Sequence, residues 1–104
     1  VVENVSMFES FDLRCSRPGQ PELHVEVKGT RSGAARVFLT ANEVEHARIH
    51  YPNVALYVLS EVHIEWSSED VVSASDGVEF VIHPWNVNDA QLRPITYEYL
   101  TQGA

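Results

Sequence analysis

Polar and apolar residues alternate along two stretches near the start of the chain, residues 11–16 and residues 23–29. Because successive side chains of a strand point to opposite faces, each stretch predicts a strand with one apolar face. Arg17–Pro21 lies between them, is rich in proline and glycine, and predicts a turn. Together they predict a β-hairpin whose core face carries Phe11, Leu13, Cys15, Leu23, Val25 and Val27 and whose other face carries Asp12, Arg14, Ser16, Glu22, His24, Glu26 and Lys28.

The polar face of this hairpin brings two carboxylates together. If the turn is centred on its glycine, Asp12 lies opposite Glu26 and Arg14 lies opposite His24, and directly opposed residues are roughly 4.5–5.5 Å apart at Cβ. Two like charges at that distance favour a cation between them. Lys28 is one such cation, and a divalent ion with few hard oxygen ligands and a shell completed by water is typical of Mg²⁺. A slip of one residue in register would instead move Asp12 to the core face.

The rest of the chain continues a mixed helix and strand pattern. Thr40–Glu43 is a capping box that predicts a helix over residues 41–50. The continuous apolar run over residues 54–59 predicts a strand buried on both faces, central in the sheet and parallel to a neighbour. Further strand-like stretches occupy residues 1–6, 36–39, 61–66, 71–74, 78–82 and 95–100. Asp76-Gly77 predicts a hairpin between residues 71–74 and residues 78–82.

Length and composition indicate a single domain. The chain has 104 residues, of which 44% are hydrophobic, enough for one core. No apolar run approaches the roughly 18–20 residues of a membrane span. The single cysteine excludes an internal disulfide and a cysteine-cluster metal site, which favours a cytoplasmic location. Because the sequence begins in strand-like residues without Met, we expect residues 1–104 to be part of a larger multidomain protein.

The charge is unevenly distributed. The formal net charge is −8, which argues against attraction of a polyanion over the whole surface. Residues 10–50 hold six basic and five acidic residues, whereas residues 51–104 hold one basic and eight acidic residues. A phosphate backbone would therefore meet the first half of the chain.

Two segments near the predicted site admit alternative interpretations. Residues 29–35 are either a flexible connection or a DNA-facing loop in which Thr30, Arg31 and Ser32 contact phosphates. At the start of the predicted helix, Asn42 and Glu43 lie at the positive end of the helix dipole, where phosphate is favoured. Capping by itself also accounts for Glu43.

Histidines occur at two places with metal-ligand spacing. His46 and His50 are four residues apart on the predicted helix, the spacing of a helical metal pair. The sequence indicates no third ligand for them, and a solvated helix face is the simpler interpretation. Glu61, His63 and Glu65 share one face of a predicted strand and admit the same two interpretations.

These motifs resemble a known family. Asp12 followed by Glu26-Val27-Lys28 is similar to the PD-(D/E)xK nuclease motif. The wider pattern resembles the nuclease-like domain named after the C-terminus of the plant protein NO VEIN, which recurs in bacterial restriction and anti-phage proteins. That wider pattern consists of Phe11-Asp12-Leu13, Val25-Glu26-Val27-Lys28-Gly29-Thr30, Leu39-Thr40-Ala41-Asn42-Glu43 and Ala55-Leu56-Tyr57-Val58.

The resemblance implies a restriction-endonuclease-like α/β (α+β) fold, a mixed β-sheet flanked by a helix. It implies that Asp12 and Glu26 are ligands of Mg²⁺, with Mn²⁺ as a substitute, that Lys28 is catalytic, and that the Val27 carbonyl is a further ligand. The sequence departs from the family at Phe11, where Pro is usual. The family also has a helix before its first strand, and this sequence shows no such helix there. We therefore expect the first core helix to be missing.

Two functions follow as hypotheses. The first is a metal-dependent DNA endonuclease module in restriction or anti-phage defence, with DNA and the other domains of the parent chain as partners and no membrane. The second is a catalytically incomplete nuclease fold that binds nucleic acid or protein, which the acidic balance and the missing helix favour. For the first, we expect a phosphate-binding surface that consists of Arg14, Thr30, Arg31, Arg36 and Asn42.

Overall fold

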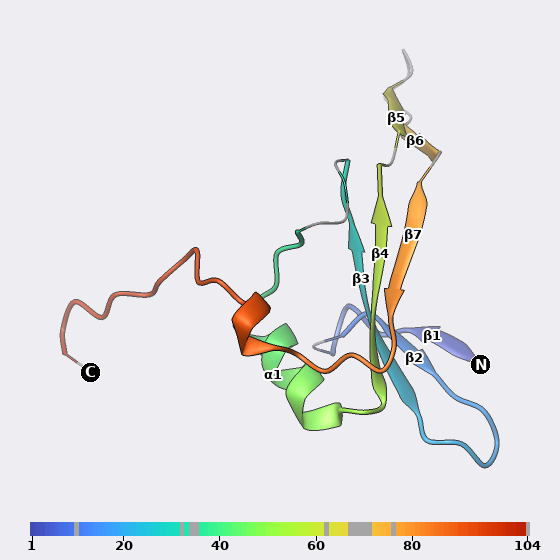
Figure 1. The fold of residues 1–104 in the computed structure, drawn as a ribbon, viewed down its shortest axis with the longest axis horizontal. Helices are drawn as coiled ribbons and strands as arrows, with labels where there is room; N and C mark the ends of the chain where they lie inside the picture. The colour runs from blue at the N-terminus through green and yellow to red at the C-terminus, as the bar shows by residue number, and fades with distance from the viewer. Residues whose placement is uncertain are drawn as a thin grey trace.

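The fold is a five-stranded mixed β-sheet with one α-helix on it. The computed structural model describes residues 1–9, 11–31, 33, 36–61, 63–66, 72–75 and 77–103, with the backbone alone for 63–66 and 72–75. In the sheet the strand order is β1-β2-β3-β4-β7, and β5 and β6 form a separate two-stranded ribbon (Figure 1). The elements are β1 Val2–Asn4, β2 Leu13–Cys15, β3 Leu23–Gly29, α1 Ala41–His50, β4 Val54–Ser60, β5 His63–Trp66, β6 Val72–Ser75, β7 Val78–Ile82 and the 3-10 helix η1 Asp89–Gln91.

The predicted hairpin and its register are confirmed. Strands β2 and β3 are antiparallel, with Arg14 opposite His24 and Leu13 opposite Val25. Asp12 lies just before β2 and continues the ladder, since its N–H donates to the Val25 carbonyl at 3.1 Å. The register therefore places Asp12 beside Glu26, as the turn predicted.

The predicted buried strand with a parallel neighbour and the predicted helix are also confirmed, but the middle strand of the sheet is β3 rather than β4. Strand β4 is parallel to β3 on one side and antiparallel to β7 on the other. Helix α1 is the crossover that a parallel β3–β4 pair requires. It begins at a capping box, in which Glu43 N–H donates to Thr40 Oγ1 at 3.2 Å and Thr40 N–H donates to Glu43 Oε1 at 2.8 Å. Among the described residues, β1 rather than a core helix precedes β2.

The prediction of which face of β3 is buried was wrong. His24 and Glu26 are 8% and 3% exposed, whereas Val27, on the predicted core face, is 37% exposed. The parallel pairing aligns His24, Glu26 and Lys28 with apolar positions of β4, and α1 packs over that face. The core there consists of Ala47, Val54, Leu56, Val58 and Trp85, with Val37, Leu39, Ile82 and Val87 packed against it.

Phe11 was also assigned to the wrong face. Its ring is 3% exposed and stacks on His24, on the helix-covered side of the sheet. Phe11 precedes the regular part of β2, so strand alternation does not fix the direction of its side chain. The helix thus covers the face that carries the polar residues.

Three local strand predictions differ from the structure. Residues 36–39 and 95–100 are not in strands. The hairpin predicted at Asp76-Gly77 does not form between its flanking strands, because β6 pairs with β5 and β7 pairs with β4. A strand added to a larger sheet is more stable than one in an isolated two-stranded hairpin, and β7 joins the sheet through five paired positions of β4. Ser32, Val62 and Asp76, and the side chains of His63 and Glu65, lie outside the described residues.

The arrangement leaves one end of the chain extended. Figure 1 shows β3, β4 and β7 running alongside one another, α1 and η1 to one side of them, and residues 92–103 leading away from the sheet. Within the described residues, no helix is both long and apolar enough to cross a bilayer.

Candidate metal-dependent active site

Three carboxylates converge where the start of β2 and the middle of β3 meet the start of α1. Asp12, Glu26 and Glu43 line a pocket of about 220 Å³ together with Ser6, Glu9, Phe11, Thr40 and Asn42. Two of the three, Asp12 and Glu26, were predicted site residues. Glu43 was interpreted as either a cap or a phosphate-side residue, and the structure adds it to the carboxylate cluster.

Asp12 is held by the backbone of the neighbouring strand. Its Oδ2 accepts a hydrogen bond from the Val27 N–H at 2.8 Å. This hydrogen bond fixes the carboxylate beside Glu26 and leaves its other oxygen available to a ligand. Asp12 is half-buried, so a ligand can reach it from solvent.

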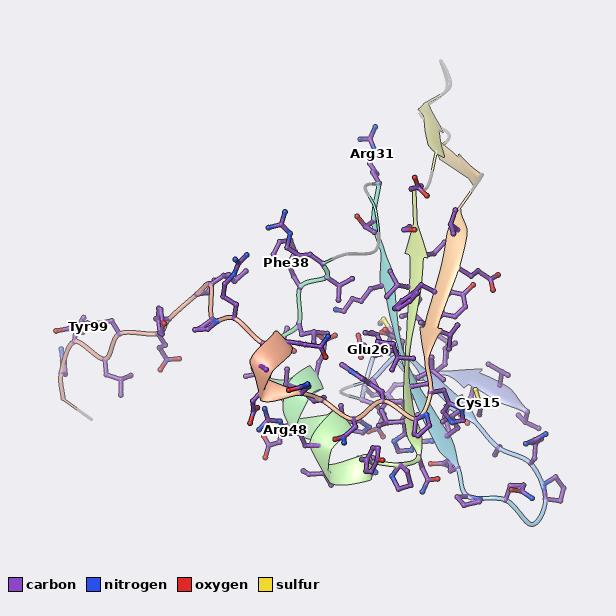
Figure 2. All side chains as sticks on the ribbon, in the orientation of Figure 1. Cys15, Glu26, Arg31, Phe38, Arg48 and Tyr99 are labelled. Carbon is purple, nitrogen blue, oxygen red and sulfur yellow. The ribbon has the colours of Figure 1, made fainter. Side chains whose placement is uncertain are left out.

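Glu26 is the most deeply buried acid of the pocket. Its side chain is 4% exposed, and Lys28 Nζ lies 3.5 Å from Oε1 (Figure 2). Burial, followed by hydrogen bonding with Glu43 and Asp12 and repulsion by both, raises the pKa of Glu26 to about 9. In the absence of a bound cation, Glu26 therefore holds a proton at neutral pH.

Glu43 and Lys28 form a close ion pair across the pocket. Lys28 Nζ donates to both carboxylate oxygens of Glu43, at 3.0 Å each. Burial alone would raise the pKa of Glu43, but hydrogen bonds from Glu26, the Thr40 backbone and Lys28 outweigh it and lower the pKa to about 2. Burial likewise opposes the charged form of Lys28, but the hydrogen bond to Glu43, the charges of Glu43 and Glu26 and the hydrogen bond to Glu26 together outweigh it and raise the pKa of Lys28. Glu43 thus fixes the position of the Lys28 ammonium.

The donor set fits a hard divalent cation. Its atoms are carboxylate oxygens, the ligands that Mg²⁺ and Mn²⁺ prefer. Two of the acids, Glu26 and Asp12, repel each other at close range, and a divalent ion would remove the cost that now keeps Glu26 protonated. Asp12 and Glu26 are the residues that would hold such an ion, and Glu43 lines the same pocket and pairs with Lys28.

Of the predicted phosphate-binding residues, Asn42 lies next to the carboxylates and two others line a second pocket. Thr30 and Arg36 line a second pocket of about 530 Å³ that Lys28 also borders, and Asn42 lines the carboxylate pocket. Arg31 is exposed at the end of β3, away from both (Figure 2).

Arg14 lies in a different environment. It is within 3.7 Å of Glu3, 3.4 Å of Glu9 and 3.3 Å of Glu22, and its guanidinium stands 5.8 Å over the ring of Phe11. These contacts engage Arg14 in ion pairs within the chain. A role for Arg14 in DNA binding stays a prediction.

Two features of the sequence together indicate that Glu43 lies near Lys28. The capping box fixes the Glu43 carboxylate at the first turn of α1. A helix that crosses from β3 to a parallel β4 starts near the carboxyl end of β3, where Lys28 is. The two observations together place Glu43 next to Lys28.

The family of the chain rests on one comparison. No curated protein and no solved structure matches it. The family model described as "Protein NO VEIN, C-terminal" matches residues 1–74, which include the hairpin, α1 and β4 and all four residues of the carboxylate and lysine cluster. That match covers more than half of the chain, and the chain therefore belongs to the NO VEIN C-terminal family.

Proposed function

We propose that this chain is the catalytic module of a Mg²⁺-dependent endodeoxyribonuclease that hydrolyses phosphodiester bonds in restriction or anti-phage defence. The observation that carries the proposal is the buried Glu26 carboxylate between Asp12, Glu43 and Lys28. Buried acids with strongly shifted pKa values that share a pocket with a lysine are typical of catalytic sites.

Each residue of the site has a role in this proposal. Asp12 and Glu26 hold the divalent ion, which supplies a water of lowered pKa and stabilises charge on the phosphoryl oxygens when it is bound. Lys28 neutralises developing phosphate charge and orients the attacking water. Glu43 holds the ammonium by accepting two of its hydrogen bonds, so Glu43 is a positioning residue.

DNA would approach over the N-terminal end of α1. The first backbone N–H groups of that helix and the side chain of Asn42 face the carboxylate pocket, and helix N-termini favour phosphate. Thr30 and Arg36 extend the polar surface past Lys28. The eight acids of residues 51–104 would lie outside this surface or against other domains of the parent chain.

A second candidate is a nuclease-fold module that binds nucleic acid or protein without cleaving it. It is favoured by the close pairing of Lys28 with Glu43, which occupies both oxygens of that carboxylate, and by the net charge of −8. In this case the carboxylate cluster would keep the arrangement of a nuclease site but would not catalyse hydrolysis.

The test is cleavage of plasmid DNA in Mg²⁺ or Mn²⁺ by the chain and by its full-length parent. We expect Glu26→Gln, Asp12→Asn and Lys28→Ala each to lower the cleavage rate by about 10²-fold or more. Glu45→Gln is the matched control, because Glu45 is an exposed acid on the same helix as Glu43. No cleavage by either protein, together with no Mn²⁺ binding by calorimetry, would favour the binding module.

A further inference from the structure

A cluster of three histidines lies beside the carboxylate pocket. His24 comes from β3, and His46 and His50 come from successive turns of α1. His24 Nδ1 is 2.8 Å from His46 Nε2, and one ring nitrogen from each of the three lies within 4.8 Å of the others. The sequence indicated a helical pair without a third ligand. The packing of α1 on β3 provides that ligand in His24.

The rings are held in place by their neighbours. Phe11 stacks on His24 with ring centroids 3.9 Å apart and on His46 at 4.6 Å, and His46 stacks on His50 at 4.2 Å. His24 is 8% exposed, so its ring has little freedom to turn into solvent. Three imidazoles are therefore packed together on one side of the helix–sheet contact.

Glu22 fixes the orientation of His24. Glu22 Oε2 lies 2.8 Å from His24 Nε2. Because an ionised carboxylate only accepts hydrogen bonds, the proton of a neutral His24 ring is on Nε2, and the lone pair of Nδ1 points toward His46. A carboxylate on the far nitrogen of a histidine is the arrangement that orients histidine ligands in metal sites.

We propose that His24, His46 and His50 bind a Zn²⁺ ion, with one imidazole nitrogen from each residue and water in the fourth position. Zn–N bonds of about 2.0–2.1 Å in tetrahedral geometry place ligand nitrogens about 3.4 Å apart. The spacing in the structure brackets that value, with 2.8 Å between His24 Nδ1 and His46 Nε2 and at most 4.8 Å across the three residues. Imidazole nitrogen selects Zn²⁺ over Mg²⁺, so this site differs chemically from the carboxylate pocket.

The ion would join two elements that otherwise share little buried surface. Of the residues of α1, Ala47 is the one that is buried. A metal bound by His24 on β3 and by two histidines on α1 adds a direct link between strand and helix. The proposal does not depend on the nuclease reaction.

The first test is Zn²⁺ titration of chelator-treated protein in excess Mg²⁺, which occupies the carboxylate pocket. We expect one Zn²⁺ per chain by calorimetry and a rise of at least about 5 °C in the unfolding midpoint. Co²⁺ in place of Zn²⁺ should give the visible absorption of a tetrahedral site. Absence of both Zn²⁺ binding and the rise in midpoint would overturn the proposal.

Variants assign the ligands. His50→Gln and His46→Gln should each weaken Zn²⁺ binding by about 100-fold or more, and Glu22→Gln by about 10-fold. His83→Gln is the matched control, because His83 is exposed and lies outside the cluster. Unchanged Zn²⁺ affinity in the His46→Gln/His50→Gln double variant, checked for native structure by circular dichroism, would also overturn the proposal. DNA cleavage is measured separately, so its presence or absence does not decide this test.

Discussion

Glu26 is the most deeply buried acid of the carboxylate pocket. It is 3% exposed and surrounded by two other acids, so its charged form is unfavourable unless a cation is bound. Lys28 is shared with Glu43, which accepts two hydrogen bonds from it at shorter distance than the contact to Glu26. The electrostatic cost at Glu26 is what gives a divalent ion its gain on binding.

This cost predicts a pH dependence of stability in the metal-free protein. The pKa of Glu26 is about 9 in the folded chain, against an ordinary value of 4.5 for a glutamate, so the folded state binds an extra proton between pH 4.5 and about 9. Stability should therefore fall as pH rises from 4.5 toward 9, by on the order of 1 kcal/mol per pH unit at most. Urea unfolding at about pH 5.5, 7 and 8.5 with chelator present measures how the free energy of unfolding changes with pH.

Glu26→Gln should remove that slope and stabilise the metal-free protein by about 1–2 kcal/mol at neutral pH. The same variant should lose Mg²⁺ or Mn²⁺ binding. Glu45→Gln, an exposed acid on α1, should keep both the slope and the binding. A wild-type stability that increases over this pH range would contradict the buried-acid account.

At the scale of elements, α1 positions the site through its N-terminus. Its capping box joins Thr40 and Glu43, and Glu43 in turn holds Lys28 of β3. The helix contributes little burial beyond Ala47. The first turn of α1 therefore both caps the helix and fixes the position of the Lys28 ammonium.

Thr40→Ala should cost about 1 kcal/mol of unfolding free energy, the typical value of a lost N-cap. Cleavage should fall as well, because the Glu43 carboxylate loses its fixed place beside Lys28. Thr40→Ser keeps the cap oxygen and should retain both properties, and Thr96→Ala in the exposed segment should change neither. Denaturant unfolding and the plasmid assay are the measurements. Full cleavage activity in Thr40→Ala would show that Lys28 needs no support from the cap.

At the scale of the whole molecule, the chain is more extended than a typical domain of its size. Its radius of gyration is 16.4 Å, against about 13 Å for a compact domain of 100 residues. Residues 92–103 lead away from the sheet, and η1 is tied to α1 by the ion pair of Arg48 and Asp89 (Figure 1). Basic residues concentrate in residues 10–50.

The charge distribution predicts which arginines affect DNA affinity. Arg36→Glu and Arg31→Glu should each weaken DNA binding about 10-fold at low salt. Each should also reduce the slope of log K against log salt concentration by about one. Arg17→Glu is the matched control, since Arg17 is exposed in the turn at the other end of β3. Fluorescence anisotropy with a DNA duplex at several salt concentrations measures both. Equal losses in all three variants would indicate nonspecific charge attraction.

The sequence by itself determined the local structure around the site. Alternation and the turn composition fixed the β2–β3 register, and the capping box fixed the start of α1. These features depend on contacts between near neighbours in the chain, which residue patterns report directly. The continuous apolar run of β4 likewise identified a buried strand with a parallel neighbour.

Only the tertiary structure decided which face of the sheet is covered and which distant residues meet there. Alternation distinguishes two faces but not the one on which a helix packs, so His24 and Glu26 were assigned to the exposed side. Strand β7 pairs with β4 in place of the hairpin that the turn signal at Gly77 predicted, because a local turn preference does not encode pairing between distant strands. The helix–sheet contact is also what brings Glu43 to Lys28 and His24 to His46, and no spacing in the sequence encodes a contact between separate elements.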